Sequence, residues 1–228
     1  MTRALLVLLA LAVMAPPAAA QTRRAPARPP APRRIELGIG GGLAGGLSLG
    51  SRDASLLSNN TSGSPFRLFS TDTRLAPAAV VEGRVGYRWT PRLMLEATMT
   101  VGWPQLTTAL SADAENAPSV DATESVTEYV ITGGAVWRFA SPRRRWTPFV
   151  SGGAGVARDV HDGQSLIESG VDSYVGGGLI YPLGSSRAAA PRSGLRLDAR
   201  LHLLSGGIVE GAGLSPRGAI TGSIFVTF

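Results

Sequence analysis

The sequence predicts an all-β fold of eight antiparallel strands in up-and-down order, and three observations support this. From Ile35 onward, apolar residues alternate with polar or small ones at a period of two, which is typical of a strand with one apolar face. Gly makes up 29 of the 228 residues, and each Gly disfavours a helix by about 1 kcal/mol relative to Ala. Long and short connections alternate along the chain, as in a meander whose every second connection lies at the same end.

The first 34 residues lie outside this pattern. Arg3 precedes an apolar run over 4–14, and Ala18-Ala19-Ala20 forms a small-x-small cleavage pattern, so residues 1–20 are predicted to be a cleaved secretory signal peptide. Residues 21–34 contain four Pro and five Arg, and we expect them to form a flexible periplasmic tail. Residues 35–228 are predicted to form one β-barrel domain.

The excess positive charge is confined to this N-terminal region. The net charge is +6, but residues 35–228 hold 16 Arg and 16 acidic residues and are formally neutral. We therefore expect no nucleic-acid binding. Cys is absent, which excludes disulfides and thiol chemistry. No His or acidic cluster has the spacing of a transition-metal site, and we expect neither a metal nor a cofactor.

The first four predicted strands alternate clearly. Residues 35–49 place Ile and Leu at odd positions and mostly Gly, Ala or polar residues at even positions. In the next three strands, over 79–89, 93–103 and 129–139, apolar residues oppose charged ones: Glu82, Arg84 and Arg88, then Glu96, then Glu128 and Arg138.

The last four predicted strands are less uniform. Residues 147–157 and 171–183 alternate weakly, residues 195–203 oppose Leu and Ala to Arg196, Asp198 and Arg200, and residues 220–228 close the chain. We expect long connections over about 51–78, 104–124, 158–170 and 205–215, and shorter ones over 90–92, 140–146 and 184–193. A count of ten strands stays open if residues 66–71 pair with another loop segment.

Alternation alone does not tell whether the apolar face points inward, as in a soluble barrel, or outward to lipid. The charges favour a polar lumen, because an unpaired enclosed charge costs several kcal/mol and the polar face carries acids and bases in equal number. Small residues at 38, 40, 42, 44 and 46 leave room there for long Arg chains. We predict a lumenal ion-pair network of Glu36, Glu82, Arg84, Arg88, Glu96, Glu128, Arg138, Arg196, Asp198 and Arg200.

Aromatic residues gather near the ends of the predicted strands. Trp and Tyr prefer the two interfaces of a membrane, so we predict an outward aromatic girdle of Tyr87, Trp89, Trp103, Tyr129, Trp137, Phe139, Trp146, Phe149 and Tyr181, with Tyr174 at the end that holds Trp103. Strands of about ten residues, at about 3.3 Å each and tilted about 40°, span an apolar band of about 25 Å. The predicted fold class is therefore an all-β, eight-stranded up-and-down antiparallel transmembrane β-barrel.

The signal peptide, the alternating strands and the last strand ITGSIFVTF resemble the small eight-stranded outer-membrane β-barrels of the OmpA and OmpX type. The resemblance implies a location in the bacterial outer membrane, contact with its lipid and lipopolysaccharide, and a monomer. In that family the last strand ends in an aromatic residue and carries apolar residues at alternate positions before it. Recognition by the barrel-assembly machinery is thereby implied for Gly222, Ile224, Val226 and Phe228.

The interior of an eight-stranded barrel is just wide enough to be filled by side chains. This disfavours a general porin, and we expect a structural or surface-interaction role through long extracellular loops. The alternatives are a narrow pore, a soluble lipocalin-like ligand-binding barrel and a lipid A-modifying enzyme.

The enzyme alternative rests on the two His residues of the chain. Some barrels that the chain resembles are lipid A deacylases with a Ser-His-Glu arrangement on the outer wall, and in them a Ser sits two residues after the His. Here Leu204 occupies that position relative to His202, while His161 lies beside Asp162 in a predicted loop. We therefore predict no enzymatic activity.

Overall fold

The structure is a computed structural model, and it describes residues 34–56, 66–112, 117–139, 146–161, 166–183, 193–207 and 214–228. The predicted signal peptide and nearly all of the predicted tail lie outside the described residues. The strands are β1 (Ile35–Ala44), β2 (Leu47–Leu56), β3 (Phe66–Leu75), β4 (Ala78–Arg88), β5 (Leu93–Gly102), β6 (Gln105–Ser111), β7 (Val120–Arg138), β8 (Thr147–His161), β9 (Ile167–Leu183), β10 (Ser193–Gly206) and β11 (Ser215–Thr227).

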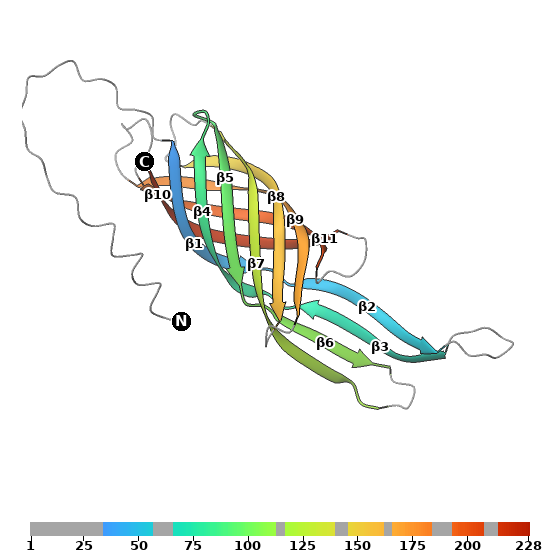
Figure 1. Cartoon of the computed structure of the whole chain (residues 1–228). Helices are drawn as coiled ribbons and strands as arrows, with labels where there is room; N and C mark the ends of the chain where they lie inside the picture. The colour runs from blue at the N-terminus through green and yellow to red at the C-terminus, as the bar shows by residue number, and fades with distance from the viewer. Residues whose placement is uncertain are drawn as a thin grey trace, which may run out of the picture. The chain divides into compact units, whose positions relative to one another are not determined.

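Eight of these strands form a closed antiparallel barrel (Figure 1). Their order around the barrel is β7-β5-β4-β1-β11-β10-β9-β8, and pairing of β7 with β8 closes the ring. The first and last strands pair over Glu36↔Thr227 to Ala44↔Ala219. Closure satisfies the backbone groups that an open sheet would leave at its edges. The predicted eight-stranded up-and-down barrel is thus confirmed.

A four-stranded sheet, which we call the extension, continues one side of the barrel in the order β2-β3-β6-β7 (Figure 1). Three barrel strands, β1, β4 and β5, connect to extension strands through short breaks at Gly45-Gly46, Ala76-Pro77 and Trp103-Pro104, whereas β7 is continuous through both sheets. We call the end of the barrel next to the extension the extension end. The opposite end, which holds Ile35 and Phe228, is the terminal end.

The extension corrects two of the expected long connections, since residues 51–78 and 104–124 are mostly strand. Segment 66–71 does pair with a supposed loop segment, as β3 with β2, but outside the barrel. The expected connections 158–170 and 205–215 are shorter than predicted, because β8 extends to His161 and β9 begins at Ile167, and β10 extends to Gly206 while β11 begins at Ser215. None of the described residues forms a helix long and apolar enough to cross a membrane.

The apolar side chains of the alternating pattern lie on the outside of the barrel. Ile39 is 68% exposed, Leu197 is 50% exposed and Ile220 is 60% exposed, whereas Arg196 and Glu82 are buried. The faces are therefore the reverse of those of a soluble barrel, in which the apolar face is enclosed.

Candidate functional site in the barrel lumen

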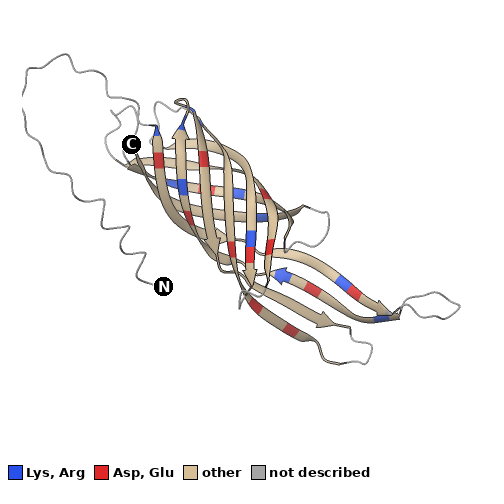
Figure 2. Ribbon diagram, in the orientation of Figure 1, with Lys and Arg blue, Asp and Glu red and all other residues tan. Residues whose placement is uncertain are grey.

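The lumen is filled by the inward side chains of the barrel strands. Figure 2 shows charged positions along many of these strands as well as on the extension. The structure places all ten residues of the predicted network there, nine of them buried and Arg88 with a side chain that is 15% exposed. Each of the ten has an opposite charge within 4 Å, but they form three separate groups rather than one network.

The central group joins three Arg and three acids. Arg196 donates hydrogen bonds to both carboxylate oxygens of Glu96 and to Asp198 Oδ1 at 2.8 Å. Arg200 Nη1 donates to Glu82 Oε2 at 2.6 Å, and Arg84 Nη1 donates to Asp198 Oδ2 at 3.3 Å. Shared carboxylates of this kind offset the desolvation of the buried charges.

The terminal end holds a smaller group, in which Arg138 and Arg88 approach Glu36 Oε2 at 2.7 Å and 3.5 Å. Between it and the central group lies an apolar layer, which we call the terminal cluster. The Arg196 guanidinium lies 4.3 Å above the ring centre of Phe149, as expected for a cation–π contact. The cluster consists of Met94, Val136, Phe149, Ile180 and Phe225, each 0–3% exposed.

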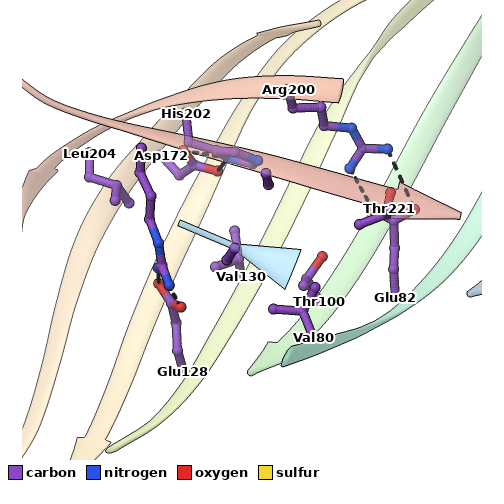
Figure 3. A pocket seen from close by; sticks show the side chains of 13 residues that line it. Val80, Glu82, Thr100, Glu128, Val130, Asp172, Arg200, His202, Leu204 and Thr221 are labelled. Atoms are coloured by element: carbon purple, nitrogen blue, oxygen red, sulfur yellow. Dashed lines mark hydrogen bonds and ion pairs between the residues drawn. The ribbon is translucent and has the colours of Figure 1, made fainter. Parts of the chain in front are cut away.

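The third group lies on the extension side of the central one and lines a cavity of about 40 Å³ (Figure 3). Such a volume holds about three water molecules. Arg217 Nη1 donates to both oxygens of Glu128 at 2.6 Å. Asp172 faces His202, with 2.9 Å between its Oδ2 and the imidazole Nδ1, and Figure 3 shows this pair across the cavity from Val80 and Thr100.

A second apolar layer, the extension cluster, lies above the cavity. It brings strands of the extension against strands of the barrel. Its buried members are Leu47, Leu49, Leu75, Ala157 and Leu204, and Leu106 and Val130 pack against them. Leu204, which stands where a deacylase-like chain would have Ser, is therefore an interior packing residue.

Titratable residues also meet at the rim, beyond the outer apolar band. On β8 that band ends at Val156, and Arg158 is exposed on the outer surface. Asp159, one residue further, is inward and buried. Burial and the nearby Glu128 carboxylate raise the pKa of Asp159 to about 7. His161 Nδ1 lies 3.2 Å from Glu124 Oε1.

Most of the predicted girdle lies on the outside of the barrel, but Phe149 and Tyr174 do not. Both are buried in the lumen, at 2% and 3% exposure, so the prediction was wrong for them. The inward positions beside them are glycines, which leave space for a ring. The exposed members are Tyr87, Trp89, Trp103, Tyr129, Trp137, Phe139 and Trp146; Tyr181 is half-buried and packs on Trp146 at 4.8 Å.

The sequence prediction missed several lumenal residues. Arg217 and Asp172 lie in or next to segments that were predicted to be connections between strands. Arg217 nevertheless occupies an odd-numbered position of β11, as the other inward residues of that strand do. The residues of the expected assembly signal face outward: Gly222, Ile224, Val226 and Phe228. No group of His and acidic residues within the described part of the chain could hold a metal ion.

The chain is similar to several solved structures. Neisserial surface protein A (NspA) matches with a TM-score of 0.51 and 16% identity, over 84% of this chain and 97% of that chain. The N-terminal β-barrel domain of Pseudomonas aeruginosa OprF matches at a TM-score of 0.40 and 13% identity, over 86% and 98% of the two chains. Ail, the attachment invasion locus protein of Yersinia pestis, matches at 0.42 and 13%, over 86% and 99%.

No family model and no curated protein sequence matches the chain. The likeness to NspA bears on the fold, and in this chain eight antiparallel strands form a closed ring. The chain therefore has the fold of the small eight-stranded outer-membrane β-barrels.

Proposed function

We propose that the protein is an integral β-barrel of the bacterial outer membrane with a closed lumen, and that it acts as a structural or surface-contact element through the extension. The outward apolar band supports insertion into lipid, because this much exposed Leu, Ile and Val would not be stable against water. Exposed Phe66 and Val120 on the extension, at 57% and 59%, support a contact role.

The stacking of layers inside the barrel carries the proposal of a closed lumen. An ion moving along the axis meets the extension cluster, then the paired charges, then the terminal cluster, whose five side chains are at most 3% exposed. Moving a bare or partly hydrated ion from water into such an apolar layer costs several kcal/mol of desolvation free energy. The described Arg residues between the two clusters each lie within 4 Å of a carboxylate, so a passing ion would have to compete with an existing ion pair.

Single-channel recording in planar bilayers tests closure. The full chain, refolded in detergent and reconstituted, should give no steady conductance, whereas the double variant Phe149→Ala and Phe225→Ala, which empties the terminal cluster, should give brief openings. Trp89→Ala, an exposed aromatic change, serves as the matched control and should behave as the wild type. Steady wild-type conductance would refute closure, and recovery of the chain in the soluble fraction of the envelope would refute membrane insertion.

We also propose that the chain has no lipid-modifying activity. His202 lies inside the barrel against Asp172, and His161 is buried beside Glu124, so neither imidazole is on the lipid-facing wall. A lipid A deacylation assay on the purified protein should be negative. Activity that disappears in His202→Ala would overturn this.

Biogenesis gives a further proposal, that the outward face of β11 is the segment recognised by the barrel-assembly machinery. Phe228 is 65% exposed and Ile224 is 58% exposed at alternate positions, which leaves their side chains accessible from the outer side of the strand. Phe228→Ala should lower the amount of heat-modifiable barrel in the outer membrane several-fold. Unchanged levels would argue against recognition through this residue.

We also propose that the protein is a monomer and that outer-membrane lipid and lipopolysaccharide surround it.

A further inference from the structure

Among the described residues, the charged side chains exposed at the terminal end of the barrel are all Arg. Arg34, just before β1, and Arg92, in the turn between β4 and β5, are both exposed, and Figure 2 shows blue at this end of β1 and β4. Glu36, the acid nearest this end, is only 2% exposed and is paired with Arg138 in the lumen. The described acids that are exposed or half-buried all lie on the extension or at the extension end of β9. They are Asp53, Asp72, Asp121, Glu124 and Glu168.

The two exposed Arg residues lie among exposed aromatic rings, on the neighbouring strand ends of β1, β4, β5 and β7. The Arg34 guanidinium donates a hydrogen bond to the Tyr87 hydroxyl at 3.0 Å, and the Arg34 carbonyl accepts one from the Arg88 N–H at 2.7 Å. Leu93, the residue after Arg92, is the register partner of Trp137. We call Arg34 and Arg92, together with the exposed rings of Tyr87, Trp89, Trp137 and Phe139, the arginine arc.

The aromatic residues set the depth of the arginine arc in a bilayer. On β4 the outward apolar side chains end at Val85, which is 54% exposed, and Tyr87 and Trp89 follow at alternate positions. Trp and Tyr prefer the level of the lipid headgroups, and long Arg side chains near them extend their charge to that level. The guanidinium groups of Arg34 and Arg92 are therefore at the level of the phospholipid phosphates.

The charge of the arginine arc determines which headgroup it favours. A guanidinium binds a phosphate through paired hydrogen bonds, and every phospholipid offers a phosphate. A zwitterionic headgroup also carries a cation, which the two Arg residues repel and which no exposed carboxylate side chain of the described residues at this end attracts. Phosphatidylglycerol lacks that cation, and one Arg near an anionic lipid surface contributes about a fivefold preference.

We propose that the arginine arc selects anionic phospholipids of the phosphatidylglycerol type through phosphate contacts of Arg34 and Arg92. The selection rests on the proposed insertion of the barrel into a membrane, which brings the arc to the headgroups. It assigns a preferred headgroup charge to one end of the barrel, whereas the outward apolar band contacts the acyl chains of any lipid.

Fluorescence quenching by brominated lipids tests this selection in phosphatidylcholine vesicles that contain the full chain. A small and equal fraction of the lipid is either phosphatidylglycerol or phosphatidylcholine with bromine on the acyl carbons nearest the headgroup. Trp103→Phe removes the Trp of the extension end, so the emission comes from Trp89, Trp137 and Trp146 at the terminal end. Because quenching averages over all lipids around these rings, we expect a preference for phosphatidylglycerol of about threefold or more at low ionic strength, which falls in high salt.

The double variant Arg34→Gln and Arg92→Gln should lower this preference by about half or more, with the Arg residues outside the described part of the chain left in place. Arg34→Lys and Arg92→Lys, which keep the charge, should retain most of the preference. The matched control is Arg74→Gln and Arg158→Gln, which makes the same change in charge at exposed positions toward the extension and should have no effect.

Four outcomes would overturn the proposal, and the heat-dependent gel shift verifies that each variant is folded. Equal quenching of the wild type by the two brominated lipids would show that the rim does not select. An undiminished preference in the double Gln variant, or the same loss in the control, would show that Arg34 and Arg92 are not responsible. Quenching by neither lipid would refute membrane insertion itself, and the selection with it.

Discussion

Replacing Arg217 with Met should destabilise the barrel by about 3–5 kcal/mol, the cost of leaving one charge of a buried pair without its partner. Glu128 is 5% exposed, and Arg217 supplies both of its short hydrogen bonds, at 2.6 Å. Arg217 Nε also donates to the Gly45 carbonyl at 2.7 Å, and losing that bond adds about 1 kcal/mol. The neighbouring Asp159 makes an unpaired Glu128 carboxylate still less favourable.

The double variant Arg217→Met and Glu128→Leu separates the charge from the packing. It leaves no unpaired charge at this site, and replacing a buried ion pair by apolar residues is often close to neutral. It should therefore regain at least about 2 kcal/mol relative to Arg217→Met alone. Such non-additivity is the signature of two residues in direct contact.

Equilibrium unfolding by urea in lipid vesicles, followed by tryptophan fluorescence and by the heat-dependent gel shift, measures these differences. A loss of about 4 kcal/mol corresponds to about a thousandfold change in the unfolding equilibrium constant. Arg158→Met, an exposed Arg on the outer surface of β8, should change the free energy of unfolding by no more than about 0.5 kcal/mol. A loss below about 1 kcal/mol in Arg217→Met, or additive losses in the double variant, would refute the reasoning.

Three further predictions use the same unfolding measurement. Leu197→Arg places a charge on the outer face of β10 and should cost about 2–4 kcal/mol in a bilayer, whereas a change within about 0.5 kcal/mol would indicate a water-facing wall. Gly178→Ala puts a Cβ against the Leu197 carbonyl oxygen and 2.7 Å from Phe149 Cζ, and it should cost about 3 kcal/mol or more. Gly133→Ala, with nothing within 4 Å of its Cβ, should be nearly neutral. The pKa of Asp159 is raised from 3.8 to about 7, so the folded state holds a proton that the unfolded state releases, and stability should fall as pH rises from about 4 to 7, by at most about 4 kcal/mol. Asp159→Asn should remove this part of the pH dependence; an unchanged profile would place the titration elsewhere.

Periodicity was sufficient to predict the barrel itself. In the middle of β4 and β10 exposed uncharged residues alternate with buried charged ones, so the two faces of each strand differ clearly there. The buried charged residues are Glu82 and Arg84 on β4 and Arg196, Asp198 and Arg200 on β10. The extension was not predicted as a separate sheet, because its strands lack this difference between an uncharged face and a charged face. Along β3, Phe66 to Thr73 are all half-buried or exposed, and residues of intermediate polarity on two wet faces leave no alternation to detect.

The lumenal charges were also predictable, whereas the apolar layers inside the barrel were not. A polar inward face is the expectation for a membrane barrel, and it places Glu96 and Arg196 correctly. Phe149 and Phe225 break that expectation, since each is an aromatic residue at an inward position. Polarity alone therefore assigns them to the wrong side or leaves them unassigned.

Side-chain volume, in addition to polarity, is a pattern within the lumen. Five large inward side chains, both aromatic and charged, lie directly opposite glycines of a neighbouring strand. A barrel of eight strands has room for side chains but little to spare, so a glycine opposite a long residue provides space for it. Some of the many Gly residues, which disfavour helices, therefore also mark positions where a large side chain of the neighbouring strand occupies the lumen. The register shows this in the pairs Phe149↔Gly178, Tyr174↔Gly153, Phe225↔Gly194, Arg84↔Gly38 and Arg200↔Gly176.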